Sequence, residues 1–372
     1  MALLDTTIVT VALPTIRSVL HASPATLEWV VSASALGATI GVSIALGPVL
    51  GGLIIAGAGA HDGWRWVFLV NLFIGAVALP IAAWQLPRAR SRIRRQFDPV
   101  GLCLLSAGLL LLLIPLVEGE QVGWPAWCYV CFGGCVAAFA LLAWWEVRAE
   151  RRGEDPLLKP GLLAQSSFSA GTIFAVVYFA GFTSVFFTIS ILWQEGLARS
   201  ALMTGLVVVP FSFGSLVSAG ISDKLSARLG RMVLVTGCAM VGIGLALAAL
   251  VVHLTAPVPG GWYLAGPLLF AGLGSGMVIA PNQDFMLARV PREEAGTASA
   301  ILGTAQRLGS AIGIAVIGTV LFGTLHVRPE PNAVASAFSQ SSQLALLANV
   351  AILVLALILV LALPRQIPRR KP

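Results

Sequence analysis

Long apolar stretches dominate this chain, and short polar segments separate them. An α-helix needs about 20 apolar residues to cross the roughly 30 Å hydrocarbon core of a bilayer. Eleven stretches are predicted to be membrane spans: 2–20, 29–57, 66–86, 100–117, 127–147, 168–192, 202–222, 232–252, 262–283, 297–325 and 342–364. The first is short for a span, because Arg17 limits its apolar part and Asp5 lies within it. The pattern therefore predicts an all-α polytopic membrane protein with 10–11 transmembrane helices.

The second apolar stretch contains the sequence GPVLGG, in which Gly47, Pro48, Gly51 and Gly52 stand out. Pro48 has no backbone N–H to donate, so it is expected to kink the helix. Gly47 and Gly51 are four residues apart, so they share a helix face and allow another backbone to approach closely. We therefore predict a kinked and closely packed span here.

The composition supports the membrane class. Hydrophobic residues make up 58% of the chain and charged residues only 10%, whereas a soluble domain has about 25% charged residues. The lipid bilayer is accordingly the expected surrounding, and the net charge of +7 does not indicate a nucleic-acid partner. The sequence has no GxxxxGK[ST] loop and no hydrolase constellation, so we expect neither an enzyme nor a cofactor.

Most Lys and Arg residues are concentrated in alternate loops. These basic segments are 87–99, 148–159, 223–231, 288–296 and the C-terminal tail. Because basic loops stay in the cytoplasm, the C-terminus and the 87–99 loop are predicted to lie inside. The 58–65 loop is then outside and the 21–28 loop inside, so the 2–20 segment either starts outside or does not cross.

Five segments carry a resemblance to a known family. They are LDTTIVTVALPTI (Leu4–Ile16), LEWVVSAS (Leu27–Ser34), ALGATIGVSIALGPVLGG (Ala35–Gly52), GWRWVFLVN (Gly63–Asn71) and PREEAGTASAILGTAQRLGSAIGIA (Pro291–Ala315). Together they resemble the fourteen-span drug:proton antiporter branch of the major facilitator superfamily. In that branch GPVLGG resembles the antiporter motif of the fifth helix, and Asp5 belongs to the first-helix motif.

The resemblance implies a secondary transporter of the plasma membrane with a central cavity between helical bundles. Its expected activity is export of small lipophilic, drug-like compounds, coupled to inward movement of protons. The implied mechanism is rocking of two bundles about a site near the middle of the membrane. The sequence gives no expectation of oligomeric state.

The sequence also departs from the family pattern. Ser34, in a segment that resembles the second helix, is followed directly by Ala35 of the fifth-helix segment. We therefore expect an internally deleted and N-terminally shortened member that lacks about three spans and transports poorly. The expected organisation is an incomplete N-terminal bundle (1–86), linker loops with two additional helices (87–159) and a C-terminal bundle (160–372). A non-transporting membrane protein or gene remnant, and a metabolite facilitator, are the alternatives.

Charged residues at membrane depth are candidates for a substrate or proton pathway. Such a group costs about 2.5–3.5 kcal/mol on insertion scales and is usually functional. Arg307 lies within the 297–325 span, and Asp284, at the end of the preceding span, is its candidate partner. The alternative for Arg307 is snorkelling to the interface. The alternative for Asp5 is a position in water near the N-terminus, where it has no role.

An aromatic row is the other candidate. Phe174, Tyr178, Phe182 and Phe186 recur every four residues and so share a helix face, which could stack on a lipophilic ligand. The alternative is contact with lipid or with a neighbouring helix. Three cysteines at 128, 131 and 135 also share a face, but no fourth ligand is near in sequence, so no metal site is predicted.

Overall fold

A computed structural model describes residues 98–119, 122–153, 160–287, 290–291, 294–326 and 332–361, together with the single positions 53, 57, 66, 69, 76 and 80. Eight helices in this part of the chain are long and apolar enough to cross a membrane. They coincide with the last eight of the eleven predicted spans, which confirms the all-α polytopic class. The predicted spans 2–20, 29–57 and 66–86 lie outside the described residues, apart from those single positions.

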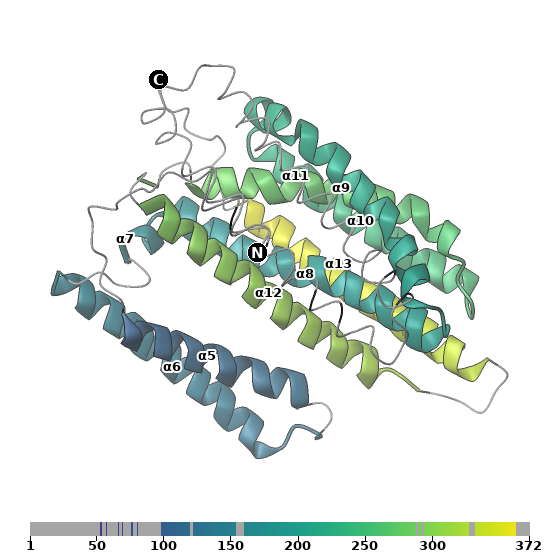
Figure 1. Ribbon diagram of the computed structural model, residues 1–372, viewed down its shortest axis with the longest axis horizontal. Helices are drawn as coiled ribbons and strands as arrows, with labels where there is room; N and C mark the ends of the chain where they lie inside the picture. The colour runs from purple at the N-terminus through teal and green to yellow at the C-terminus, as the bar shows by residue number, and fades with distance from the viewer. Residues whose placement is uncertain are drawn as a thin grey trace.

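The helices follow one another with short connections (Figure 1). Their bounds are α5 Pro99–Glu118, α6 Ala126–Arg151, α7 Pro160–Leu163, α8 Ser166–Ile191, the π-helical turn η1 Leu192–Gly196, α9 Ala201–Leu229, α10 Met232–Thr255, α11 Gly261–Leu287, α12 Ala295–Gly323 and α13 Ala333–Val360. The predicted division into three regions is not tested by this arrangement and stays a prediction.

Helix ends follow local chemistry. Asp98 caps α5 by accepting a hydrogen bond from the Gly101 backbone N–H at 2.8 Å, and Pro99 occupies the first helical position, where no donor is needed. The Ser200 side chain likewise caps α9. That helix ends at Gly230, whose φ of +55° suits a residue without a side chain.

Two helices, α9 and α13, differ most from the predicted spans. Helix α9 continues to Leu229, although 223–231 was expected to be a loop. A helix can extend beyond the hydrocarbon core with charged residues, so hydropathy underestimates its length. Helix α13 begins at Ala333, nine residues before the predicted span. Its first turns carry the serines Ser339, Ser341 and Ser342, which lower the hydropathy of the sequence although all three side chains are buried.

Helices α8 to α13 form one bundle, and α5 and α6 form a hairpin along one side of it (Figure 1). Within the bundle the most extensive contacts join α9 to α11, α10 to α11, α8 to α12 and α10 to α13. The hairpin packs mainly on itself and meets the bundle through contacts of α5 with α12. Most hairpin side chains are therefore exposed, as expected for helices that face lipid.

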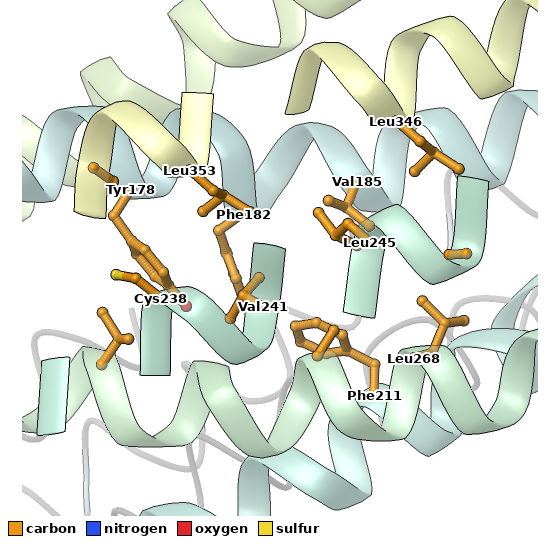
Figure 2. Close-up of a cluster of buried hydrophobic side chains, with 14 of the residues drawn as sticks. Tyr178, Phe182, Val185, Phe211, Cys238, Val241, Leu245, Leu268, Leu346 and Leu353 are labelled. Carbon is orange, nitrogen blue, oxygen red and sulfur yellow. The ribbon is translucent and has the colours of Figure 1, made fainter. Parts of the chain in front are cut away.

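Large apolar side chains fill the centre of the bundle. Figure 2 shows Phe182 of α8, Phe211 of α9, Leu245 of α10, Leu268 of α11 and Leu353 of α13 converging between their helices. Because lipid is as apolar as these side chains, they stabilise the bundle by packing closely and not by being removed from water.

Backbone-to-backbone packing joins other pairs of helices. Gly309 and Gly313 of α12 lie so close to the carbonyl groups of Val176 and Ala180 in α8 that a Cβ atom would overlap them. Gly244 of α10 packs on α11 in the same way. Glycine permits this approach because it has no side chain, and small residues are the usual means by which membrane helices pack closely.

Candidate transport pathway

The aromatic row of α8 lies inside the bundle. Phe174, Tyr178 and Phe182 are buried and Phe186 is half-buried. Successive ring centroids along the row are 5.8, 6.0 and 5.2 Å apart, and Phe211 of α9 closes the group at 5.9 Å from Phe182 and 5.1 Å from Phe186. These are ordinary distances for packed aromatic pairs. The placement supports interhelical packing, and ligand contact by this row stays a prediction.

Tyr178 links the aromatic row to α11. Its hydroxyl donates a hydrogen bond of 3.0 Å to the hydroxyl oxygen of Ser275, which is fully buried (Figure 2 shows Tyr178 among the core side chains). A buried tyrosine hydroxyl normally has such a partner. The sequence places Tyr178 in an aromatic row, but it does not identify Ser275 as its partner on another helix.

Two further polar pairs cross between helices. Ser184 of α8 donates to the Asn349 side-chain oxygen of α13 at 2.5 Å, and Thr183 of α8 lies 2.7 Å from Ser310 of α12. Both pairs belong to the polar interhelical contacts that hold membrane bundles together. Sequence analysis missed them, although an asparagine within an apolar stretch is a signal that could have been used.

Among the described residues, three buried amide oxygens have no hydrogen-bond partner, and one of them belongs to Gln165, just before α8. The other two belong to Asn282 of α11 and Gln306 of α12, inside the bundle, and each of these residues is 3% exposed. Asn282 faces α8, because a Cβ atom at Gly171 would lie 3.6 Å from its oxygen. A buried acceptor without a donor costs about 1–3 kcal/mol, so each oxygen has free capacity to accept a hydrogen bond.

Arg307 lies deep in its helix and is exposed. It follows the first residue of α12, Ala295, by 12 positions in a helix of 29 residues. At 1.5 Å per residue it is about 18 Å from that end of a helix about 43 Å long. A centred helix places it about 11 Å inside a 30 Å hydrocarbon core. This depth favours a partner or a water-filled cavity over snorkelling, because the membrane centre is where a cation costs most.

Asp284 is also exposed, but it lies only three residues before Leu287, where α11 ends. Asp284 is therefore about 4.5 Å along the helix axis from the end of α11. Arg307 is about 18 Å from the start of α12, so the two residues lie at different depths. Among the described residues no ion pair joins Asp284 to Arg307. Direct pairing of the two therefore stays a hypothesis without support from their placement.

The other sequence candidates divide into two groups. Asp5, Gly47, Pro48, Gly51 and Gly52 lie outside the described residues. The α6 cysteines are described, and those at 128 and 135 are buried. Within the described residues, His, Cys, Asp and Glu side chains form no group of three that could hold a metal ion.

Comparison with known proteins gives one family and several relatives. Residues 100–314 match the Major Facilitator Superfamily. The chain is 36% identical over 299 residues to the "Probable actinorhodin transporter" of Streptomyces coelicolor, covering 80% of this chain and 52% of that protein. It is 29% identical over 289 residues to "Multidrug resistance protein Stp" of Mycobacterium tuberculosis, covering 77% and 51%.

A third relative is the "Tetracenomycin C resistance and export protein" of Streptomyces glaucescens. It is 28% identical over 284 residues, which cover 76% of this chain and 51% of that protein. The chain thus spans about half the length of the curated relatives that it matches.

Proposed function

The chain belongs to the major facilitator superfamily, and on this basis we propose that it is a secondary transporter that exports small lipophilic compounds. The observation that carries the proposal is the 36% identity to the protein named "Probable actinorhodin transporter". Two further relatives are named for drug resistance or for resistance and export. We assign no catalytic step to the protein.

Its helices support a transport role. Eight described helices are suited to cross a membrane, and their interior combines packed aromatic rings with hydroxyl and amide groups. Polar groups that are costly to place in a membrane usually mark a pathway. We propose that export is coupled to inward movement of protons, as in the fourteen-span branch that the sequence resembles. Asp5, Asp284 and Arg307 are the proposed charged groups of this pathway.

Transport can be tested in everted membrane vesicles from a bacterial host that lacks its own drug exporters. We expect dye uptake above that of vesicles without the protein, and we expect a protonophore to abolish it. Uptake that persists without a proton gradient would refute proton coupling, and uptake equal to that of empty vesicles would refute export by this chain.

The expected lack of about three spans gives a further prediction for the same assay. The transport rate should be well below that of a full-length relative at equal protein level. A rate equal to that of the relative would show that the spans are not required.

We also propose a plasma-membrane location with a cytoplasmic C-terminus, from the distribution of basic loops. Labelling of single cysteines with a membrane-impermeant reagent tests this orientation. A cysteine at position 253, in the exposed last turn of α10, should react from outside, and a cysteine at position 366 should react only after permeabilisation. The opposite result would invert the topology.

A further inference from the structure

One face of α12 differs from the exposed faces of the other helices. Over residues 296–311 its members recur at helical spacing, and Ile314 follows on the same side: Gly296, Ala300 and Arg307 are exposed, and Gly303, Thr304 and Ala311 are half-buried; these six residues are hereafter the open face. The exposed faces of α10 and α13 instead carry large apolar side chains, which include Ile243, Leu247, Leu250, Leu344, Leu347 and Leu355. Up to Ala311, this side of α12 therefore presents small and polar residues beside Arg307, where α10 and α13 present large apolar ones.

The open face is turned away from the packed side of α12. A Cβ atom at Gly296 or at Gly303 would meet no described atom within 4 Å. Gly309 and Gly313, on the other side of the same helix, pack directly on the α8 backbone. Arg307 therefore projects from a side of the helix where a molecule could approach it.

The described helices around Arg307 provide no carboxylate at its depth. The sequences of α8, α12 and α13 contain neither Asp nor Glu. In α11 the only acidic residue is Asp284, three residues from the helix end, and in α5 it is Glu118, the last residue. Within the described chain, Arg307 makes no hydrogen bond or ion pair, so its charge has no protein counter-ion there.

We propose that Arg307 binds an anionic group, such as a carboxylate, on the lipophilic compound that the protein exports. This proposal rests on the export function proposed above. A guanidinium group is always charged and presents a planar set of donors that matches a carboxylate in a bidentate manner. In a site with little water the attraction is stronger than in solution. Arg307 would thus select acidic amphipathic compounds over neutral or cationic ones of equal size.

The test uses three fluorescent probes of the same ring system: anthracene carboxylate, its methyl ester and anthracene methylammonium. Purified protein is reconstituted into proteoliposomes, and transport of each probe is compared for the unmodified chain, Arg307→Gln and Arg307→Lys. Arg228→Gln, which removes a cation at the exposed end of α9, is the matched control. Because a charged hydrogen bond is lost, Arg307→Gln should transport the carboxylate about tenfold or more slowly than the unmodified chain. Its transport rate for the ester should stay within about twofold of that of the unmodified chain. Arg307→Lys should retain part of the carboxylate transport, and Arg228→Gln all of it.

Equal loss for the carboxylate and the ester in Arg307→Gln would overturn the proposal, because Arg307 would then act within the protein. A preference of the unmodified chain for the cationic probe would overturn it as well. Thermal unfolding of each variant in detergent verifies that Arg307→Gln folds. If Arg307→Gln does not fold, Arg307→Lys is compared with the unmodified chain instead.

Equilibrium binding separates this proposal from the export function. The fluorescence of each probe is titrated with detergent-solubilised protein. If no probe is transported but the carboxylate binds about tenfold more weakly to Arg307→Gln than to the unmodified chain, export by this chain fails and the anion site stands. Carboxylate binding that is unchanged by Arg307→Gln overturns the anion site whatever the transport result.

Discussion

The close contact between α10 and α11 gives a prediction that two neighbouring glycines can test. A Cβ atom at Gly244 would lie 2.7 Å from both the Cβ and the backbone nitrogen of Ala271, and 2.8 Å from the carbonyl oxygen of Pro267. Ordinary contact begins at 3.4 Å, so Gly244→Ala requires α10 and α11 to separate locally by roughly 0.7 Å. Gly242, two residues earlier in the same helix, has no described atom beyond its own helix backbone within 4 Å of its Cβ position.

Two opposing effects determine the result. Alanine favours a helix over glycine by about 0.5–1 kcal/mol at either position. Overpacking at Gly244 costs about 1–3 kcal/mol, because neither backbone can move independently of its helix. Gly242→Ala should therefore leave the free energy of unfolding unchanged or raise it slightly. The free energy of unfolding of Gly244→Ala should be about 1–3 kcal/mol lower than that of Gly242→Ala. Because both variants gain the same helix propensity, this difference gives the packing contribution.

The measurement is reversible unfolding in mixed micelles, in which a denaturing detergent is titrated against protein in a mild one and followed by tryptophan fluorescence. Both variants should reach similar levels in the membrane. Equal stability of the two variants would refute the assigned contact between α10 and α11. Greater damage at Gly242 would show that this face of α10 packs on another element.

Three further predictions concern polar contacts and can use the same unfolding assay. Ser184→Ala leaves the buried Asn349 oxygen without its donor and should cost about 1–3 kcal/mol; no loss would mean that the pair contributes nothing to stability. Tyr178→Phe removes only the hydroxyl that donates to Ser275 and should cost about 0.5–1.5 kcal/mol while the ring packing is kept. A larger loss would indicate that the aromatic row rearranges. Asp98→Ala removes the cap of α5 and should cost about 0.5–2 kcal/mol, whereas Asp98→Asn, which keeps a capping oxygen, should cost less.

The positions of the described spans could be predicted from sequence because a helix that crosses lipid needs a continuous apolar stretch of known length. The ends were harder to predict. Residues 333–341 of α13 include serines that are buried between helices, and the end of α9 carries Asp223, Lys224 and Arg228, so hydropathy indicated a loop in each case. Burial of small polar groups depends on neighbouring helices that a single stretch of sequence does not specify.

The candidate pathway was only partly predictable for a related reason. Arg307 could be identified because a cation within an apolar stretch is rare and costly. The pairing of Ser184 with Asn349 could not be identified, because it depends on how two helices are rotated about their axes. The same limit applies to the glycines of α12. Their spacing shows that Gly309 and Gly313 share a face, but only the fold shows that this face packs on α8 while Gly303 faces away.

The glycine contacts also determine which parts of the bundle can slide. Where backbones touch, no side chain can change its rotamer to absorb a shift, so helices joined in this way are displaced together. This applies to α8 with α12 and to α9, α10 and α11 as a second unit. The two units meet instead through large side chains such as Phe182 of α8 and Leu245 of α10, which have alternative rotamers, and Leu353 of α13, a helix in contact with both units, packs in the same layer. Shear within this bundle is therefore expected along that layer of large side chains, since small sliding of packed helices is accommodated by side-chain adjustment.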